Sequence, residues 1–540
     1  MVRTAAPEAA ALPTAPWQVR AGWLLRAHRI SHPDPALRGL GGFARAFGAG
    51  RGAAGTASPS ALSRWETGRT PVPHAAVRRY EQVLGLVPHQ LISVVETIAR
   101  YEGGPSAEAF TRASTAQPGR GGPVQRRMDL LLDKVLDADV VTGDDWDELT
   151  LRATRPGGLV SPGRIRRAVT ERLLEETLVA DGVAWMRRFE AFGRLMADPQ
   201  WAPEAVAACE QVAAQAGHAG LIEAVCALDT SAHPDAARHV LRQLTDPTNA
   251  DSFYGALLAC LRKCRKRHFT PDQGRVLADV VGSLLTGDGA RQEDAQAAAT
   301  LLHRLPVSAA RAARLVEAAA DRPATRTIVL HGSLVEPALA AVGVARVHAR
   351  MSRADGPGPA AGVLGAVVDD VLHHPVADVR LYTAMLLDAS PYGQDVAAAL
   401  AAELQLAGTV QAAERAVPML HALRVLGGPE QRPVVAGLTL AQGVPHSVVR
   451  AAVHAIGHIG GRSPEAYWRA VLLRHTENRA HRSGPAADGQ LKRLVYGFAM
   501  NGELDLLKRL VHERGRSDPL PDLSAYWTGL PHHIRDSARR

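Results

Sequence analysis

The sequence predicts an almost entirely α-helical protein. Hydrophobic residues make up 46% of the 540 residues, but aromatic residues only 4%. Ala, Leu and Val dominate the apolar positions, and this balance suits closely packed helices better than sheets, which draw on aromatic and β-branched side chains. A chain of this length exceeds what one compact core usually organises, so we expect several domains or an elongated repeat array.

The basic charge is concentrated near the amino terminus. The formal net charge of the chain is +8. Residues 17–102 contain eleven arginines against five acidic residues and so carry +6 of it, whereas everything after residue 125 sums to +1. A polyanion is therefore expected to be attracted mainly to the first hundred residues.

Composition and periodicity divide the chain into five segments. Residues 1–16 are rich in Ala, Pro and Thr and are expected to be a disordered tail. Residues 17–102 show helical periodicity, and residues 103–125 are rich in Gly, Pro, Ser and Thr, which predicts a flexible linker. Residues 126–530 alternate helical stretches with short breaks, and residues 531–540 are expected to be a second tail.

Sharp helix boundaries are predicted in the first hundred residues. Apolar residues recur at helical spacing in residues 17–30, and a second short helix is expected to end at Phe47. In the stretch that follows, Ser58 can cap a helix whose first position is Pro59. Gly68 can adopt the left-handed conformation that ends such a helix. A short, well-bounded helix is therefore expected.

This stretch resembles the recognition helix of the XRE family, the helix-turn-helix fold of the Cro and repressor proteins of lambdoid phages. The signature positions are Ser58, Leu62, Ser63, Trp65, Glu66, Gly68 and Arg69. The resemblance covers roughly residues 17–100 and implies a five-helix domain that binds double-stranded DNA. Operators of this family are usually short palindromes, so the resemblance also implies a homodimer.

The same resemblance assigns DNA-contacting roles to six residues. The major-groove positions are Ser60, Ser63 and Arg64, and the phosphate-contact positions are Ser58, Arg69 and Thr70. Arginine suits the first task because its guanidinium can bond guanine O6 and N7 together. Phosphate contacts fix the position of the protein on DNA and carry no sequence information directly.

Other residues of the motif are expected to be structural. Leu62 and Trp65 are predicted to lie in the core, and Glu66 is predicted to pair with Arg26. The connection at residues 48–57 is several residues longer than is usual for this motif. It could form a flexible wing near the DNA backbone, or the preceding helix could extend; both leave the docking angle open.

The later part of the chain shows a period of 35 residues. Arg380, Arg415 and Arg450 recur at that interval, and an apolar helical run follows each arginine. The pattern resembles HEAT repeats, helical hairpins that share a core with their neighbours in an α-solenoid. In that family the arginine usually ties adjacent repeats together, so a structural role is expected. From residue 126 to residue 360 the repeat is degenerate.

No motif predicts a catalytic, cofactor-binding or metal-binding residue. Cys260, Cys264 and His268 recur every four residues, but zinc normally takes four ligands and nothing adjacent completes the set. We expect packed cysteines there, and we expect the basic residues within 262–267 to form a solvated helix face. The chain contains no phosphate-binding loop, no nucleophile elbow, no HExxH and no dinucleotide fingerprint.

The function expected from these features is sequence-specific DNA binding in transcriptional regulation. The repeat domain would bind a protein or small-molecule partner, or mediate dimerisation. The alternatives are a DNA-tethered protein-interaction scaffold and a HEAT-type DNA-processing enzyme; the near-neutral array argues against the enzyme. Without a spanning apolar run, a signal-like segment or a disulfide framework, we expect no membrane partner and a cytoplasmic, nucleoid-associated protein.

Overall fold

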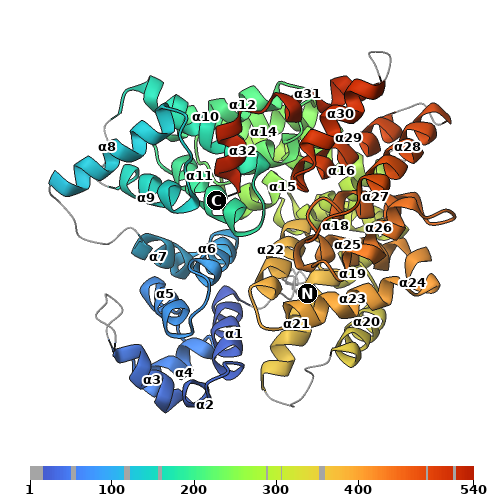
Figure 1. Cartoon of the computed structure of the whole chain (residues 1–540). Helices are drawn as coiled ribbons and strands as arrows, with labels where there is room; N and C mark the ends of the chain where they lie inside the picture. Colours follow the sequence, from blue (N-terminus) through green and yellow to red (C-terminus); the bar gives the residue numbers. More distant parts are fainter. Residues whose placement is uncertain are drawn as a thin grey trace, which may run out of the picture.

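The computed structural model describes residues 16–49, 56–114, 122–155, 161–287, 290–305, 307–351, 359–481, 485–514 and 519–539 (Figure 1). Within these residues the chain forms 32 α-helices and no strand, which confirms the all-α prediction. None of the helices in this part of the chain combines the length and the apolar composition that a membrane crossing requires.

The first seven helices form an N-terminal bundle. They are α1 (Trp17–Ile30), α2 (Pro35–Arg38), α3 (Leu40–Gly48), α4 (Pro59–Glu66), α5 (His74–Val83), α6 (Gln90–Glu102) and α7 (Pro105–Ser114). Helices α1, α3, α4, α5 and α6 correspond to the five that the sequence predicts, and α2 and α7 are additional. Aromatic rings of α3 and α5 form part of the core, where Phe43 and Tyr80 have centroids 4.7 Å apart.

Helix α7 corrects the predicted linker at residues 103–125. Ala107 and Phe110 are buried, three residues apart on one face of α7, and the Phe110 ring lies 5.2 Å from that of Trp17. The Gly- and Pro-rich composition of the segment concealed this short apolar face. The next helix begins at Gly122, also inside the predicted linker, and residues 115–121 lie outside the described residues.

The helices after the bundle form two layers. The first group is α8 (Gly122–Leu136), α9 (Gly143–Ala153), α10 (Gly163–Val179), α11 (Gly182–Ala197), α12 (Ala202–Ala213), α13 (Leu221–Ala227), α14 (Pro234–Thr245), α15 (Ala250–Arg265), α16 (Pro271–Thr286), α17 (Gln292–Leu301), α18 (Ala309–Ala320) and α19 (Pro323–His331). Helices α10, α13, α15 and α17 contact one another in succession, and α12, α14, α16 and α18 form a second row that packs against them.

The same arrangement continues to the carboxyl end. The helices there are α20 (Pro337–Arg350), α21 (Pro359–His373), α22 (Ala377–Asp388), α23 (Gly393–Leu404), α24 (Ala407–Gln411), α25 (Ala413–Leu426), α26 (Arg432–Leu440), α27 (His446–Ala455), α28 (Glu465–His481), α29 (Pro485–Met500), α30 (Leu504–Arg514), α31 (Leu520–Gly529) and α32 (His532–Ala538). Helices α22, α25, α27, α29 and α31 follow one another in contact, and α23, α26 and α28 cover them as a second row.

The last helix closes the two layers on themselves. Residues 531–540 were predicted to be a tail, but α32 packs against α10. The Ser537 hydroxyl accepts a hydrogen bond from the Val141 N–H at 2.9 Å, and the Ser537 carbonyl accepts one from the Arg188 guanidinium. The tail prediction is therefore wrong. The contacts that decide it could not be read from the segment itself, because the two partners lie 396 and 349 residues earlier in the sequence. The helices of the first row line a partly open cavity of about 360 Å³.

The N-terminal bundle packs directly on the later helices. Arg20 of α1 and Asp370 of α21 form a buried ion pair with N–O 2.8 Å. Arg100 of α6 pairs with Glu190 of α11 at 2.7 Å. A flexible connection between separate units was expected from the sequence, whereas the bundle shares buried ion pairs with α21 and α11, which flank it (Figure 1).

The basic cluster at residues 262–267 is largely part of this interface. Arg262 is buried and pairs with Asp229 at 2.8 Å. Lys263 is also buried and donates to a backbone carbonyl at 2.8 Å. Arg265 donates to two backbone carbonyls at the end of α6. The predicted solvated face is therefore wrong for Arg262 and Lys263, because their helix is covered on this side. Cys260 and Cys264, by contrast, are packed as predicted.

Two of the periodic arginines do not tie adjacent repeats together. Arg380 donates to the His374 carbonyl in the turn before its own helix, at 2.6 Å. Arg450 pairs with Glu293 of α17 at 3.1 Å. Both arginines line the cavity. The predicted role is wrong for these two, and for Arg415 it stays a prediction.

Candidate nucleic-acid interface

Helix α4 begins and ends where its sequence signals predict. The Ser58 hydroxyl accepts a hydrogen bond from the Ala61 N–H at 3.2 Å, and Pro59 occupies the first helical position. Gly68 has φ +67°, the left-handed conformation expected just beyond a helix end. Because both ends are set locally, the rotational position of each side chain around the helix is set as well.

Two glycines allow α1 and α4 to approach closely. A Cβ on Gly22 would lie 2.3 Å from the Trp65 carbonyl oxygen, and a Cβ on Gly68 would lie 2.7 Å from Val19 Cα. Neither atom fits without moving backbone. Leu62 is fully buried as predicted, whereas Trp65 is only half-buried. Helix α4 is therefore held at a fixed distance from α1.

Arg29, and not the predicted Arg26, pairs with Glu66. The Arg29 guanidinium bonds both carboxylate oxygens, with Nε–Oε1 2.6 Å and Nη2–Oε2 2.7 Å. The Tyr80 hydroxyl donates to Oε1 at 3.0 Å, and burial together with the Glu66 charge raises the pKa of Tyr80. Arg29 lies one turn after Leu25 and shares its buried face, whereas Arg26 is half-buried.

The outer face of α4 carries the predicted groove-facing side chains. Of the six predicted DNA-binding residues, Ser58, Ser60, Arg64 and Arg69 are exposed, and Ser63 and Thr70 are half-buried. The Arg64 guanidinium donates to the Ser60 hydroxyl at 2.9 Å, because residues four apart lie on the same face of a helix. The six residues thus occupy one continuous stretch at and beside α4.

The acidic residues of the N-terminal bundle are mostly turned inward. Glu66, Glu81 and Glu96 are buried, Glu102 is half-buried and accepts a bond from the Trp17 N–H, and Asp34 and Glu108 are exposed. The exposed arginines of the described bundle are Arg38, Arg45, Arg64, Arg69 and Arg78. The surface of the bundle is therefore more basic than its net charge alone indicates, a property that the sequence could not show.

Glu81 has a structural role that the sequence did not indicate. Its carboxylate accepts hydrogen bonds from the backbone N–H groups of Leu91 at 2.8 Å and Ile92 at 3.0 Å. These N–H groups lie in the first turn of α6 and have no acceptor within the helix. The side chain of the N-cap residue of α6 does not accept a hydrogen bond from them, so Glu81 takes that role. Burial nevertheless raises the pKa of Glu81, because removal from water opposes its charge more than these bonds support it.

The chain matches no protein-family model, no curated protein and no solved structure. The expected XRE relationship therefore rests on the residues and geometry of α4. Helix α3 ends at Gly48, directly after Phe47. The alternative in which the preceding helix extends is therefore wrong. Residues 50–55 of the long connection to α4 lie outside the described residues, so the flexible wing stays a prediction.

Proposed function

We propose that this protein is a sequence-specific, DNA-binding transcriptional regulator whose helix α4 enters the major groove. The observation that carries the proposal is the outer face of α4, where Ser60, Ser63 and Arg64 reach solvent. The helix is short, capped and packed against α1, and the surface around it displays arginines, while three of the six acidic residues of the bundle are buried. A polyanionic duplex is the partner that this charge distribution favours.

Each exposed group on α4 has a chemically suitable partner on DNA. The fork of Arg64 can bond guanine O6 and N7 together, and the hydroxyls of Ser60 and Ser63 can donate or accept. The contact between Arg64 and Ser60 restricts the guanidinium before binding, which lowers the entropy lost on contact. Ser58, Arg69 and the N-terminal N–H groups of α4 would bind phosphates.

The remaining helices would serve the regulator as a partner-binding and dimerisation unit. Their two-layer packing is compatible with the HEAT-like α-solenoid expected from the 35-residue period. A homodimer is proposed because a palindromic operator presents two equivalent half-sites. We place this regulator in the cytoplasm, at the nucleoid.

The test is selection of bound duplexes from a random pool by the full-length protein, followed by fluorescence anisotropy. Arg64→Ala should weaken binding to the selected site by about 1–3 kcal/mol and relax the preference at one base pair. Arg69→Ala should weaken binding to all sequences alike and lower the salt dependence by about one counterion. Arg275→Ala, an exposed arginine of α16, is the charge-matched control and should change neither quantity.

Two results would contradict the proposal. Enrichment of no sequence, with binding that depends only on salt, would favour the DNA-tethered scaffold. A selected site that Arg64→Ala binds with unchanged affinity and preference would show that α4 does not read the bases.

A further inference from the structure

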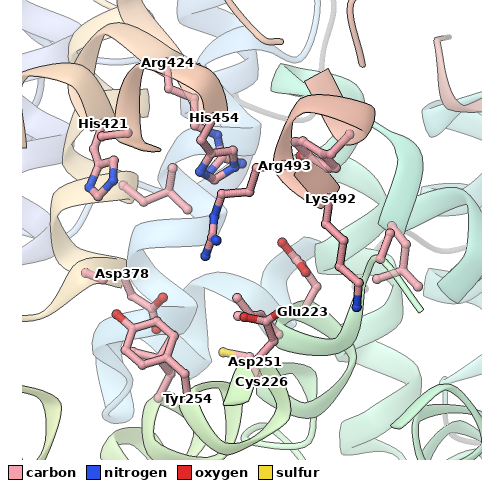
Figure 2. A pocket seen from close by; sticks show the side chains of 18 of the residues that line it. Glu223, Cys226, Asp251, Tyr254, Asp378, His421, Arg424, His454, Lys492 and Arg493 are labelled. Carbon is pink, nitrogen blue, oxygen red and sulfur yellow. The ribbon is translucent and has the colours of Figure 1, made fainter. Parts of the chain in front are cut away.

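The cavity lined by the later helices is not used by the proposed DNA contact. Its volume of about 360 Å³ falls in the range of small-molecule sites, about 300–1,000 Å³. Its walls come from helices far apart in the sequence, including α10, α13, α15 and α22, and α25, α27 and α29. Figure 2 shows that Arg424, His454 and Arg493 lie across the cavity from Asp378, Tyr254 and Asp251.

The wall formed by α25, α27 and α29 is positively charged. Arg424, Arg450, Lys492 and Arg493 supply the charge, and Arg450 is already paired with Glu293 of α17. His421 and His454 do not add to it, because burial and the neighbouring arginines lower the pKa of His421 to about 3 and that of His454 well below its ordinary value. The two imidazoles are therefore neutral hydrogen-bonding groups beside fixed cations.

The wall formed by α13 and α15 carries carboxylates. Burial raises the pKa of Glu223, and Asp251 is half-buried beside it along the cavity. Within the described residues, neither carboxylate has an ion-pair partner, and the same holds for Arg424 and Lys492. Charges of both signs held apart in a partly dehydrated site are costly, and a ligand with complementary charges would offset that cost.

Aromatic side chains are concentrated around the cavity. Four of the eight tyrosines of the chain line it, namely Tyr254, Tyr382, Tyr496 and Tyr526. Trp185 and Phe189 also line it and stack on each other with centroids 4.7 Å apart and an interplanar angle of 14°. In a chain with only 4% aromatic residues, this local enrichment favours a ligand with a planar apolar body.

We propose that this cavity binds a small zwitterion with an aromatic body. An anionic oxygen group would bind Lys492 and Arg493, which both reach into the cavity (Figure 2), and an ammonium group would bind Glu223 and Asp251. The ring would pack among the aromatic side chains. Two oppositely charged ends, each with its own wall, would fix the direction in which the ligand lies.

Helix α22 links this cavity to the N-terminal bundle. Asp378, Leu381 and Tyr382 line the cavity. Tyr382 also packs against Tyr101 of α6, and the neighbouring Thr383 accepts a hydrogen bond from Arg20 of α1 at 3.1 Å. Occupancy of the cavity would therefore be coupled to DNA affinity through α22. This second step rests on the proposed DNA-binding function.

The binding step is tested by calorimetry on the full-length protein without DNA. The probes are L-tryptophan, tryptamine and indole-3-propionate at millimolar concentration, which share one ring and differ in charged groups. L-Tryptophan should bind tightest. Lys492→Gln should weaken the binding of L-tryptophan and indole-3-propionate about tenfold and leave the affinity for tryptamine unchanged. Glu223→Gln should weaken the binding of L-tryptophan and tryptamine, the two probes that carry an ammonium group, and leave the affinity for indole-3-propionate unchanged.

The unaffected probe shows in each case that the variant is folded, and Arg275→Gln on the surface should change no affinity. Binding of none of the three probes, or equal effects of each variant on all three, overturns the proposed site. L-Tryptophan should change the affinity for the selected duplex by about fivefold or more, and the duplex should change the affinity for L-tryptophan by the same factor. Binding of L-tryptophan with unaltered DNA affinity overturns the coupling alone, and failure to bind DNA leaves the calorimetric result intact.

Discussion

The aromatic rings of Tyr101 in α6 and Tyr382 in α22 pack with centroids 5.1 Å apart. The Arg262 guanidinium lies 4.7 Å from the centre of the Tyr101 ring and donates to the Tyr382 hydroxyl at 3.1 Å. Asp229 balances the arginine charge. This buried group joins the N-terminal bundle to the wall of the cavity.

A double-mutant cycle measures the contact between the two rings. Tyr101→Leu and Tyr382→Leu should show a coupling of about 0.5–1.5 kcal/mol in the free energy of unfolding, because an aromatic pair contributes beyond its buried area. Urea unfolding followed by circular dichroism gives the four free energies. Tyr467→Leu in α28 is the control. Its effect on the free energy of unfolding should add to that of Tyr101→Leu without a coupling. Additivity of the Tyr101 and Tyr382 changes would contradict the interface.

Substitution of Arg29 distinguishes the observed ion pair from the predicted one. Arg29→Met should destabilise the protein by about 3–5 kcal/mol, because it leaves the buried Glu66 carboxylate without its counter-charge. Arg26→Met should change the free energy of unfolding by no more than about 0.5 kcal/mol. The reverse ranking in urea unfolding would restore the pairing expected from the sequence.

Two glycines share the left-handed backbone conformation but differ in the space around them. Comparing their alanine variants therefore separates the cost of backbone strain from the cost of steric crowding. Gly85 has φ +62° and open space around it, whereas Gly68 has φ +67° and faces Val19. Gly85→Ala should cost about 1 kcal/mol, the left-handed penalty alone. Gly68→Ala should cost at least about twice as much, because the added methyl group must displace the backbone of α1. Equal losses of stability would show that α4 is not tightly held against α1.

The burial of Lys263 should make the stability of the protein depend on pH. Burial lowers its pKa from 10.5 to about 8, so the unfolded chain binds this proton more tightly than the folded protein. The free energy of unfolding should therefore rise with pH, by about 2–3 kcal/mol from this residue between about pH 7 and pH 10. Lys263→Met should remove this increment. An unchanged pH profile in the variant would mean that the ammonium group is not held in a dry site.

The local signals around α4 were readable from the sequence because they act over a few residues. The cap at Ser58 and the left-handed Gly68 each depend on near neighbours, and both lie as predicted. The partner of Glu66 was not readable, since Arg26 and Arg29 are similar in sequence and only the packing of α1 on α4 distinguishes them. Helix α7 was missed because its two buried side chains are set in a Gly- and Pro-rich segment.

By itself, the sequence determined the helical fold class, the limits of α4 and the concentration of basic charge in the first hundred residues. Composition, capping and helical periodicity are properties of neighbouring residues, so they survive without knowledge of the fold. Tertiary structure alone decided that Arg262 is buried, that α32 closes on α10 around Ser537, and that Glu223 and Lys492 line one cavity. Each of these depends on contacts between residues tens to hundreds of positions apart, whose pairing is decided only when the helical layers pack together.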